Sequence, residues 1–326
     1  MAGTDTQLLG PEVTRKPAGA ARRPPNGKGA QLSWGQRLAA FRRAAAESVF
    51  IWPMLLLVGV LMVFPTATAI YRSFFDWNPG YDSPFVGFGN YRYLFESDVF
   101  REIAINQLIF VLGVPLWAGV PLLVALLLYE RVPAAGVFRT IFFFPAVLSP
   151  VILGLLFRSF LRADGVLNVT LEDLGLGSLA RPWIDDPSYV KPVVILVAVW
   201  YTMGFGVIFY SAALSTVPPE LFEAAELDGA NWFQRLWYIL LPRIMPIFLL
   251  NTIFSVATAF LLFPYAYVLT RGGPGYASTS IDYDIYQNAL QSGFYGIASA
   301  EAVLLLLVMT VVLFTAYLVG RRVWVQ

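Results

Sequence analysis

The sequence predicts an all-α integral membrane protein with about six transmembrane helices. Of its 326 residues, 58% are hydrophobic and only 13% are charged, against about 45–50% and 25% in an ordinary soluble domain. The hydrophobic residues are grouped in blocks of about twenty, the length that a helix needs to cross a hydrocarbon core about 30 Å thick. A chain of this composition cannot cover itself with a water-soluble surface, so lipid is its main solvent.

Six apolar stretches supply the predicted spans. They are residues 49–71, 103–129, 137–161, 192–214, 236–264 and 299–320. An even number of spans places both termini on the same side of the membrane. Residues 1–46 hold eight Lys or Arg against two acidic residues, and Arg321 and Arg322 follow the last span. Because basic flanks stay inside, we expect both termini to be cytoplasmic.

The first 46 residues are expected to form a basic, flexible cytoplasmic tail without a fold, since they are rich in Gly, Ala, Pro, Arg and Lys and lack apolar periodicity. A secretory signal is the competing interpretation. Its apolar part would be about 7–15 residues long, whereas the stretch that begins at Val49 is longer and continues without a break. An anchored helix is therefore favoured.

This topology sorts the connecting loops into two groups. Residues 72–102, 162–191 and 265–298 are expected outside, and residues 130–136 and 215–235 inside. The outer loops are long and rich in Asp, Gly, Pro and aromatic residues, so they are candidates for docking a soluble partner. The alternative is that they are solvated connections whose aromatic residues anchor the helices at the membrane interface.

The residue inventory excludes several kinds of chemistry. The chain contains no His and no Cys, which removes disulfides, Cys/His zinc sites, thiol nucleophiles and imidazole bases. It has no Gly-x-Ser-x-Gly motif and no acidic pair deep in a predicted span, so a membrane-embedded enzyme is disfavoured. Glu301 is the one acidic residue near the start of a span, and we expect it to face water.

The inner loop that leads into the fifth span stands apart from the rest of this apolar chain. Its residues 218–242 predict two short helices joined by a turn. The pair Pro218-Pro219 begins the first helix, Gly229 supplies the positive φ that ends it, and Trp232 and Phe233 open the second. Acidic residues, Glu220 and Glu223 among them, lie near the positive end of the first helix.

Such a helix suits insertion into a groove of a partner, because it carries acidic residues on one side and Leu221, Phe222 and Leu227 on others. The alternative is an amphipathic helix lying on lipid headgroups. Helices of that kind usually carry Lys and Arg on the polar face, and no Lys or Arg occurs between Glu220 and Gln234. A coupling element is therefore favoured.

The same segment resembles the EAA loop of ABC importer permeases. The resemblance consists of Glu223-Ala224-Ala225, Gly229 six positions after the Glu, and, after nine more residues, Ile239 and Leu241-Pro242. Asp228-Gly229-Ala230 and the ending Leu241-Pro242 are similar to the carbohydrate-uptake branch of that family. Leu236 departs from the pattern, since an aromatic Phe is common there.

Four other segments resemble the same branch, and the resemblance covers roughly residues 47–320. They are residues 73–77 (Ser-Phe-Phe-Asp-Trp), 85–91 (Phe-Val-Gly-Phe-Gly-Asn-Tyr), 269–274 (Leu-Thr-Arg-Gly-Gly-Pro) and 295–300 (Tyr-Gly-Ile-Ala-Ser-Ala). The Gly-Gly-Pro element is more typical of the maltose importer's larger permease, or of the first permease of glycerol-phosphate importers, than of their second permeases. The resemblance thus implies one permease domain over residues 47–326.

The resemblance implies a binding-protein-dependent importer in a bacterial plasma membrane, with a sugar or sugar-like solute as cargo. The partners would be a second homologous permease, two ATPase subunits, an extracytoplasmic binding protein and membrane lipid, but no nucleic acid. ATP and Mg would bind to the ATPase; no cofactor and no metal is expected on this chain. Gly27-Lys28 lacks the rest of a Gly-x-x-x-x-Gly-Lys-Ser/Thr phosphate loop, so this chain is expected not to be an enzyme. The ATPase-coupling residues implied are Glu223, Ala224, Ala225, Asp228, Gly229, Leu241 and Pro242.

Candidates for a substrate path lie on the two helices that flank the coupling loop. A sugar needs hydroxyl, amide and aromatic partners, and these helices offer Tyr201, Thr202 and Phe205, and Asn251, Ser255 and Thr258 at helical spacing on one face. In related sugar permeases these helices line the path, and the same register would include Ala259 and Leu262. The alternative is ordinary packing, because Ser, Thr and Asn also hydrogen-bond between membrane helices.

An ion-coupled secondary transporter or a channel remains the alternative function, since such proteins also use kinked helices and polar stripes. It would be expected to carry acidic residues deep in a span for its coupling ions, and the sequence indicates none. The importer interpretation is therefore preferred.

Overall fold

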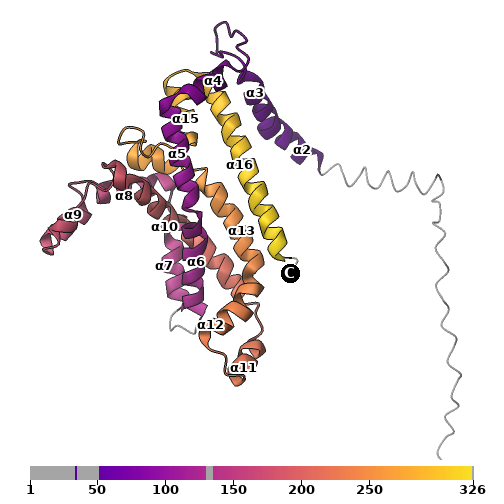
Figure 1. Cartoon of the computed structure of the whole chain (residues 1–326), viewed down its shortest axis with the longest axis vertical. Coiled ribbons are helices and arrows are strands. Elements are labelled where there is room, and N and C mark those ends of the chain that lie inside the picture. Colours follow the sequence, from indigo (N-terminus) through magenta and orange to yellow (C-terminus); the bar gives the residue numbers. More distant parts are fainter. Residues whose placement is uncertain (1–33, 35–50, 130–134, 325–326) are drawn as a thin grey trace, which may run out of the picture. The chain divides into compact units, whose positions relative to one another are not determined.

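The computed structural model describes residues 51–129 and 135–324, together with Trp34. In this part of the chain all regular elements are helical, and the one β-type pairing described is an isolated bridge between Phe75 and Phe85 (Figure 1). The chain divides into two units, residues 1–61 and residues 62–326. The predicted tail, residues 1–46, lies outside the described residues except for Trp34.

The first unit contains α2 and the start of a π-helical segment, η1. Their bounds are Trp52–Val58 for α2 and Gly59–Val63 for η1. The second unit contains the remaining helices, which are α3 (Phe64–Arg72), α4 (Gly89–Glu96), α5 (Asp98–Leu112), α6 (Val114–Tyr129), α7 (Ala135–Val147), α8 (Pro150–Leu161), α9 (Val166–Asp173), η2 (Gly177–Leu179), α10 (Pro187–Leu214), α11 (Pro219–Leu227), α12 (Trp232–Arg235), η3 (Leu236–Leu240), α13 (Leu241–Ala259), α14 (Phe263–Tyr265), η4 (Ala266–Thr270), α15 (Ile281–Tyr286), η5 (Gln287–Gln291) and α16 (Tyr295–Trp324).

Five helical stretches are long and apolar enough to cross a membrane, and a bent pair of helices supplies a sixth. The five are Trp52–Arg72, Asp98–Tyr129, Pro187–Leu214, Trp232–Ala259 and Tyr295–Gly320, and the bent pair is Gly136–Val147 with Pro150–Asp173. These stretches overlap the six predicted ones, so the all-α membrane fold is confirmed.

The third span differs from the prediction of one helix over residues 137–161. The two halves of this span meet at an angle of 99° between Val147 and Pro150. Pro150 disfavours a helical conformation at the residue before it, and Ser149 is extended, with φ −63° and ψ 134°. Pro145 has no N–H to continue the hydrogen-bond ladder just before the bend. The prediction of a single helix there is wrong.

Helix α10 is at the centre of the second unit and packs against α6, α7 and α13. Two of its glycines make the close approaches possible. A Cβ on Gly206 would lie 2.6 Å from Cβ of Pro121 on α6, and a Cβ on Gly204 would lie 2.8 Å from the carbonyl oxygen of Phe142 on α7. Small residues of this kind let membrane helices pack backbone to backbone. Val194 and Ala198, on the same helix, are fully buried.

The fifth span ends at Ala259, five residues before the predicted end at Pro264. Two buried side chains of α5 hold the irregular segment that follows. Gln107 donates its amide to the carbonyl of Ala259 at 2.7 Å and accepts the N–H of Ile281 at 3.4 Å. Asn106 donates to the carbonyls of Tyr276 and Thr279. Backbone groups that leave the helix inside a membrane need such partners.

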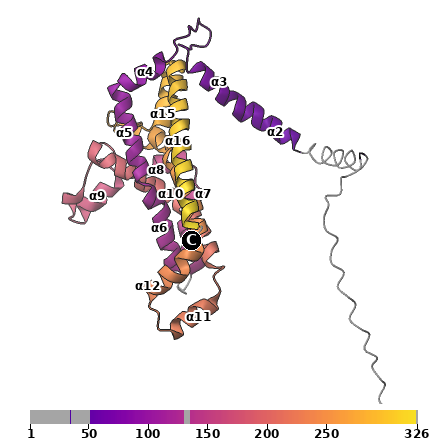
Figure 2. The same ribbon diagram turned by 45° about the vertical axis from the view of Figure 1, so that its right-hand side comes forward.

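The two ends of the second unit carry different elements. Helices α4 and α15 lie at one end, and α11 and α12 lie at the opposite end, in both views of the ribbon (Figures 1 and 2). Helices α13 and α16 pack side by side between these ends. The loops at residues 72–102 and 215–235, predicted on opposite sides of the membrane, thus lie at opposite ends of the unit.

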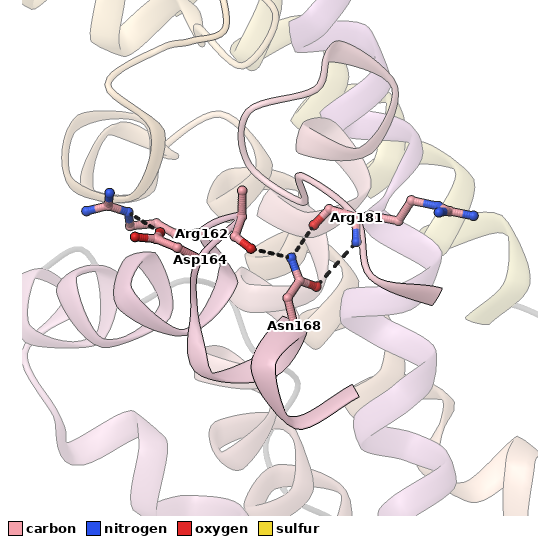
Figure 3. A network of polar contacts seen from close by, with 5 residues as sticks. Arg162, Asp164, Asn168 and Arg181 are labelled. Carbon is pink, nitrogen blue, oxygen red and sulfur yellow. Dashed lines mark hydrogen bonds and ion pairs between the residues drawn. The ribbon is translucent and has the colours of Figure 1, made fainter. Parts of the chain in front are cut away.

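A short arm formed by α9 and the loop after it projects beyond α8 in both views. Figure 3 shows that Asn168 holds this arm together. Its amide donates to the carbonyls of Ala163 and Arg181 at 3.0 and 2.8 Å, and its oxygen accepts from the indole of Trp183 at 2.8 Å and from the N–H of Arg181 at 3.3 Å. An exposed ion pair, Arg162 with Asp164, lies beside it (Figure 3).

Replacing Asn168 with Ala should loosen the arm, because the substitution removes four part-buried hydrogen bonds. The carbonyl of Arg181 keeps a bond from the N–H of Trp183, whereas the N–H of Arg181 and the indole of Trp183 lose their partner. Each such group costs about 1–3 kcal/mol, so we expect the loop at residues 174–186 to be cleaved faster in limited proteolysis. Thr170→Ala is the matched control, since its hydroxyl bonds only to Val166 of the same exposed helix. Equal cleavage rates for both variants would contradict the role of Asn168.

Candidate functional site

The segment after the fourth span folds as two short helices, α11 and α12, as predicted, and α12 forms the start of the fifth span. Pro219 opens α11 and Glu220 lies in its first turn. The helix ends in a turn in which Gly229 has φ +75°. The N–H of Gly229 bonds to the carbonyl of Glu226 at 3.0 Å and that of Ala230 to Ala225 at 2.8 Å, the pair of bonds that defines a Schellman motif.

Helix α12 begins at Trp232 with a capping box that the sequence analysis did not single out. The side chain of Asn231 accepts the N–H of Gln234 at 3.0 Å, and the side chain of Gln234 accepts the N–H of Asn231 at 2.8 Å. These reciprocal bonds satisfy backbone donors at the start of the helix. The signal was present in the sequence as Asn followed three residues later by Gln.

The two faces of this segment differ in exposure. Leu221 and Phe222 pack towards the bundle, where the ring of Phe222 lies 5.8 Å from that of Tyr129. The acidic residues Glu223 and Glu226 are exposed. Leu227 is 89% exposed and Phe233 is 66% exposed. The segment therefore presents carboxylates and two large apolar side chains that touch little else in this chain.

A cavity of about 610 Å³ lies between this segment and α6. Glu223, Glu226 and Arg235 line it together with Tyr129 and Phe222. The Nε atom of Arg235 is buried and has no hydrogen-bond partner, although two carboxylates border the same cavity. The cavity is thus bordered on one side by the exposed helix α11 and on the other by the membrane-spanning helix α6.

The other predicted coupling residues continue along the same segment. Ala224 and Asp228 are exposed, Ala225 is half-buried, and Leu241 packs against the core beneath α11. Pro242 lies in the first turn of α13. Between α12 and α13 the π-helical segment η3 makes Trp232–Ala259 one span. The structure therefore connects the exposed helix pair directly to the fifth span.

On α10, the predicted substrate-path residues have some exposed surface. Phe205 is 47% exposed, and Tyr201 and Thr202 are half-buried. The ring of Tyr201 lies 6.3 Å from that of Tyr265, and the hydroxyl of Thr202 bonds to the carbonyl of Ala198 on its own helix at 2.9 Å. Only Phe205 of these three presents a large exposed side chain.

On α13, the predicted stripe is mostly buried inside this chain. Asn251 and Ser255 are buried, and Thr258 is half-buried. Asn251 donates to the hydroxyl of Tyr210 at 3.1 Å, and Tyr210 donates to the carbonyl of Ala118 at 3.1 Å. This chain of bonds ties α13, α10 and α6 together, which is the packing role considered as the alternative.

The two positions added by register, Ala259 and Leu262, are fully buried in the main core cluster. The carbonyl of Ala259 is held by Gln107. Both residues therefore contact other core residues of this chain and have no surface exposed to a path. The predicted path therefore separates into a partly exposed group on α10 with Thr258, and a buried group formed by Asn251, Ser255, Ala259 and Leu262.

Glu301 does not face water, contrary to the expectation from sequence. It is 1% exposed within the last span, and Asn288 donates to its Oε1 at 2.8 Å. Asp284, from α15, is also buried beside it. Burial raises the pKa of the Asp284 carboxyl above its ordinary value. The expectation was wrong because a lone acid at the start of an apolar stretch does not reveal what folds over it.

Comparison with known proteins gives consistent results. Residues 104–325 match the family described as "Binding-protein-dependent transport system inner membrane component". The chain is 33% identical to the arabinooligosaccharides transport system permease protein AraP of Halalkalibacterium halodurans, over 83% of this chain and 87% of AraP. It is 30% identical to the lactose transport system permease protein LacF of Rhizobium radiobacter, over 84% of this chain and 93% of LacF.

Solved structures show the same fold. A chain of a bacterial ABC transporter that imports the acidic polysaccharide alginate superposes with a TM-score of 0.76 and 26% identity, covering 87% of this chain and 98% of that one. A chain of the alginate transporter in complex with an alginate pentasaccharide-bound periplasmic protein gives a TM-score of 0.75 at 26% identity, over 88% of this chain and 97% of that one.

The helical bundle, its six apolar stretches and these matches define the class of protein, a multi-pass membrane subunit of a transporter. The chain belongs to the family of binding-protein-dependent transport system inner membrane components. It is a permease subunit of an ATP-binding-cassette importer.

Proposed function

We propose that this permease forms, with a second homologous permease, the path for a sugar or sugar-like solute. The solute would be delivered by an extracytoplasmic binding protein and moved by two ATPase subunits that dock onto α11 and α12. ATP and Mg would bind to those ATPases and not to this chain, which would itself not be an enzyme. The termini would be cytoplasmic and the membrane a bacterial plasma membrane.

The exposed face of the α11–α12 segment carries this proposal. Leu227 and Phe233 are large apolar side chains left in the open, beside the exposed carboxylates of Glu223 and Glu226. Exposed apolar residues rimmed by polar ones are typical of a protein interface. The hydrogen-bonded turn at Gly229 joins the two helices, and η3 continues them into α13, so closure of the ATPases would rock the fifth span between two states.

The relatives support the choice of cargo. LacF and AraP are described as lactose and arabinooligosaccharides permeases, and the superposed structures belong to an alginate importer. Phe205 and Tyr201 on α10 offer aromatic faces, and Thr202 and Thr258 offer hydroxyls. We propose these four residues as the part of the path that this chain presents. Asn251, Ser255, Ala259 and Leu262 would support that surface from within the bundle.

An ion-coupled transporter would need acidic groups inside the bundle, and Glu301 is buried within the last span. That observation removes one argument made from the sequence against such a mechanism. Two others remain. The family itself depends on binding proteins, and the α11–α12 segment has an exposed acidic face that an ion-coupled transporter does not require.

Reconstitution into vesicles tests the proposal. Vesicles that hold this chain, the second permease and the ATPases should accumulate radiolabelled sugar only with ATP on the ATPase side and the binding protein on the other side. Lactose and an arabinooligosaccharide are the first probes, and the ligand that co-purifies with the binding protein then identifies the cargo. Vesicles that hold this chain alone should show no uptake. Accumulation by this chain alone on an ion gradient would overturn the proposal.

A further inference from the structure

A second cavity, of about 380 Å³, lies between α8, η4, α15 and η5. Helix α8 packs against η4, and a Cβ on Gly154 of α8 would lie 2.9 Å from Cβ of Val268 on η4. Helix α15 is at the end of the second unit opposite α11 and α12 (Figures 1 and 2). None of the residues that line this cavity belongs to the coupling segment or to the proposed substrate path.

Two arginines line this cavity, Arg158 from α8 and Arg271 from the end of η4. The lining residues include no Asp and no Glu. In the described part of the chain, the three ion pairs involve other arginines, so neither Arg158 nor Arg271 pairs with a carboxylate there. Two positive charges on the wall of one cavity repel each other. A bound anion would remove this repulsion.

The backbone of Arg271 is a second, independent observation. Arg271 has φ +54° and ψ +35°, the left-handed conformation, in the position that ends η4. It is the one non-glycine residue with a positive φ among the described residues. Glycine is the usual residue at such a helix end, because a side chain makes this conformation costly. Outliers of this kind are concentrated at ligand sites, so the guanidinium of Arg271 has a use other than forming the turn.

The polar part of the wall extends around Arg271. Tyr267 and Tyr283 lie close enough to Arg271 for its charge to act on both hydroxyls. Gln291 adds a side-chain amide. Tyrosine and arginine are typical of the zone where a membrane protein meets the lipid headgroups. The polar wall therefore combines positive charge with several hydrogen-bond donors.

The apolar part of the wall is a stripe on α8. Val151 and Leu155 line the cavity, and Arg158 follows them at helical spacing on the same face. Both aliphatic side chains are exposed, although α8 belongs to the bent third span. An exposed aliphatic stripe thus leads along a membrane helix to the two guanidinium groups.

We propose that this cavity binds an anionic phospholipid, with its phosphate between Arg158 and Arg271 and one acyl chain along Val151 and Leu155. Arginine binds phosphate through paired N–H donors, and tyrosine hydroxyls donate to the remaining oxygens. Basic pockets between membrane-spanning helices bind anionic headgroups in this way. A free anion or a sugar acid would leave the aliphatic stripe uncovered. The site uses neither the cargo nor the ATPases, so its test is independent of the proposed function.

Native mass spectrometry of the assembled transporter, stripped of lipid in a neutral detergent, measures this binding with phosphatidylglycerol as the probe. The tightest site of the wild type should prefer phosphatidylglycerol to phosphatidylcholine with the same acyl chains by about tenfold or more. Arg158→Gln and Arg271→Gly should each weaken that site about fivefold, and the double variant about 30-fold.

Two comparisons separate lipid binding from folding and from general charge. Arg271→Gly keeps the turn, because glycine adopts a positive φ without strain. Its unfolding midpoint in lipid-free detergent should therefore equal or exceed that of the wild type. Arg181→Gln makes the same change in charge outside the cavity, on an exposed residue whose guanidinium bonds only to the carbonyl of Ala180. This control should bind phosphatidylglycerol like the wild type.

Equal affinities of the wild type and the double variant would overturn the proposal, since the lipid would then bind elsewhere. Binding to the isolated chain but not to the assembled transporter would also overturn it, because the second permease would then cover the cavity. Inorganic phosphate and galacturonate, each at about ten millimolar and matched ionic strength, test the other anions. Neither should displace the lipid, as neither has an acyl chain. Displacement by either would show a site for the free anion or the sugar acid, and would overturn the lipid assignment.

Discussion

Glu223→Arg should abolish ATP-driven uptake while leaving the chain folded and inserted in the membrane. Glu223 is exposed on α11 and also borders the cavity that contains Arg235. Reversing its charge removes a carboxylate from the proposed docking face and places a second guanidinium beside that of Arg235, whose buried Nε has no partner. Breaking a charged contact at an interface costs about 2–5 kcal/mol or more, which is a loss of about 30-fold or more in ATPase binding.

Co-purification of the ATPase with the tagged permease measures this effect, with uptake in the reconstituted vesicles as the second readout. Glu102→Arg is the control, because it makes the same change in net charge on an exposed residue of α5, remote from α11 and α12. It should keep both ATPase binding and uptake. If Glu223→Arg retained the ATPase at the wild-type level, α11 would not be the docking element.

The membrane-spanning stretches and the turn between α11 and α12 were predictable because their signals are local. Runs of about twenty apolar residues identify a span whatever surrounds it. The glycine at position 229 indicated a positive φ, because the conformation that ends α11 is costly for other residues. The structure shows φ +75° there. Pro219 likewise predicted the start of α11 through its fixed φ and missing N–H.

The bend in the third span had a local signal that was given too little weight. Pro150 restricts Ser149 to extended conformations, but proline is also common inside membrane helices, where neighbours satisfy the freed backbone groups. Deciding between a kink and a 99° break requires knowing what packs around the freed carbonyls, which the sequence does not state. The α9 arm, held by Asn168, depends on contacts of the same long-range kind.

Burial of individual polar residues was the least predictable property. Asn251, Ser255 and Glu301 were all expected to meet water or substrate, and all are buried. Their environment is set by residues distant in sequence, such as Tyr210 for Asn251 and Asn288 for Glu301. A hydrophobic pattern gives the positions of spans, but the face that a helix turns to its neighbours follows from packing of the whole bundle.

The close packing of α10 leads to the second large effect. Gly204→Val should prevent α7 from seating against α10, because a Cβ at position 204 would lie 2.8 Å from both the carbonyl oxygen of Phe142 and the Cα of Phe143. Those atoms are backbone and cannot rotate away, so the two helices must move apart. Overpacking of this kind costs about 1–3 kcal/mol, and occasionally more, while natural stabilities are only about 5–15 kcal/mol.

Size-exclusion chromatography of detergent extracts measures the folded fraction, and thermal unfolding gives the shift in midpoint. We expect Gly204→Val to lower the folded fraction strongly, and Gly119→Val, on α6, to leave it close to the wild type. Both substitutions place the same β-branched side chain in a helix interior, but a Cβ at position 119 meets no atom within 4 Å. The difference in folded fraction between the two variants therefore measures the steric contact with α7, because the loss of helix propensity is the same in both. Equal losses in both variants would mean that propensity, and not the approach of α7 to α10, limits stability here. A selective loss at Gly204 would make this close approach a requirement of the fold that holds the coupling segment in place.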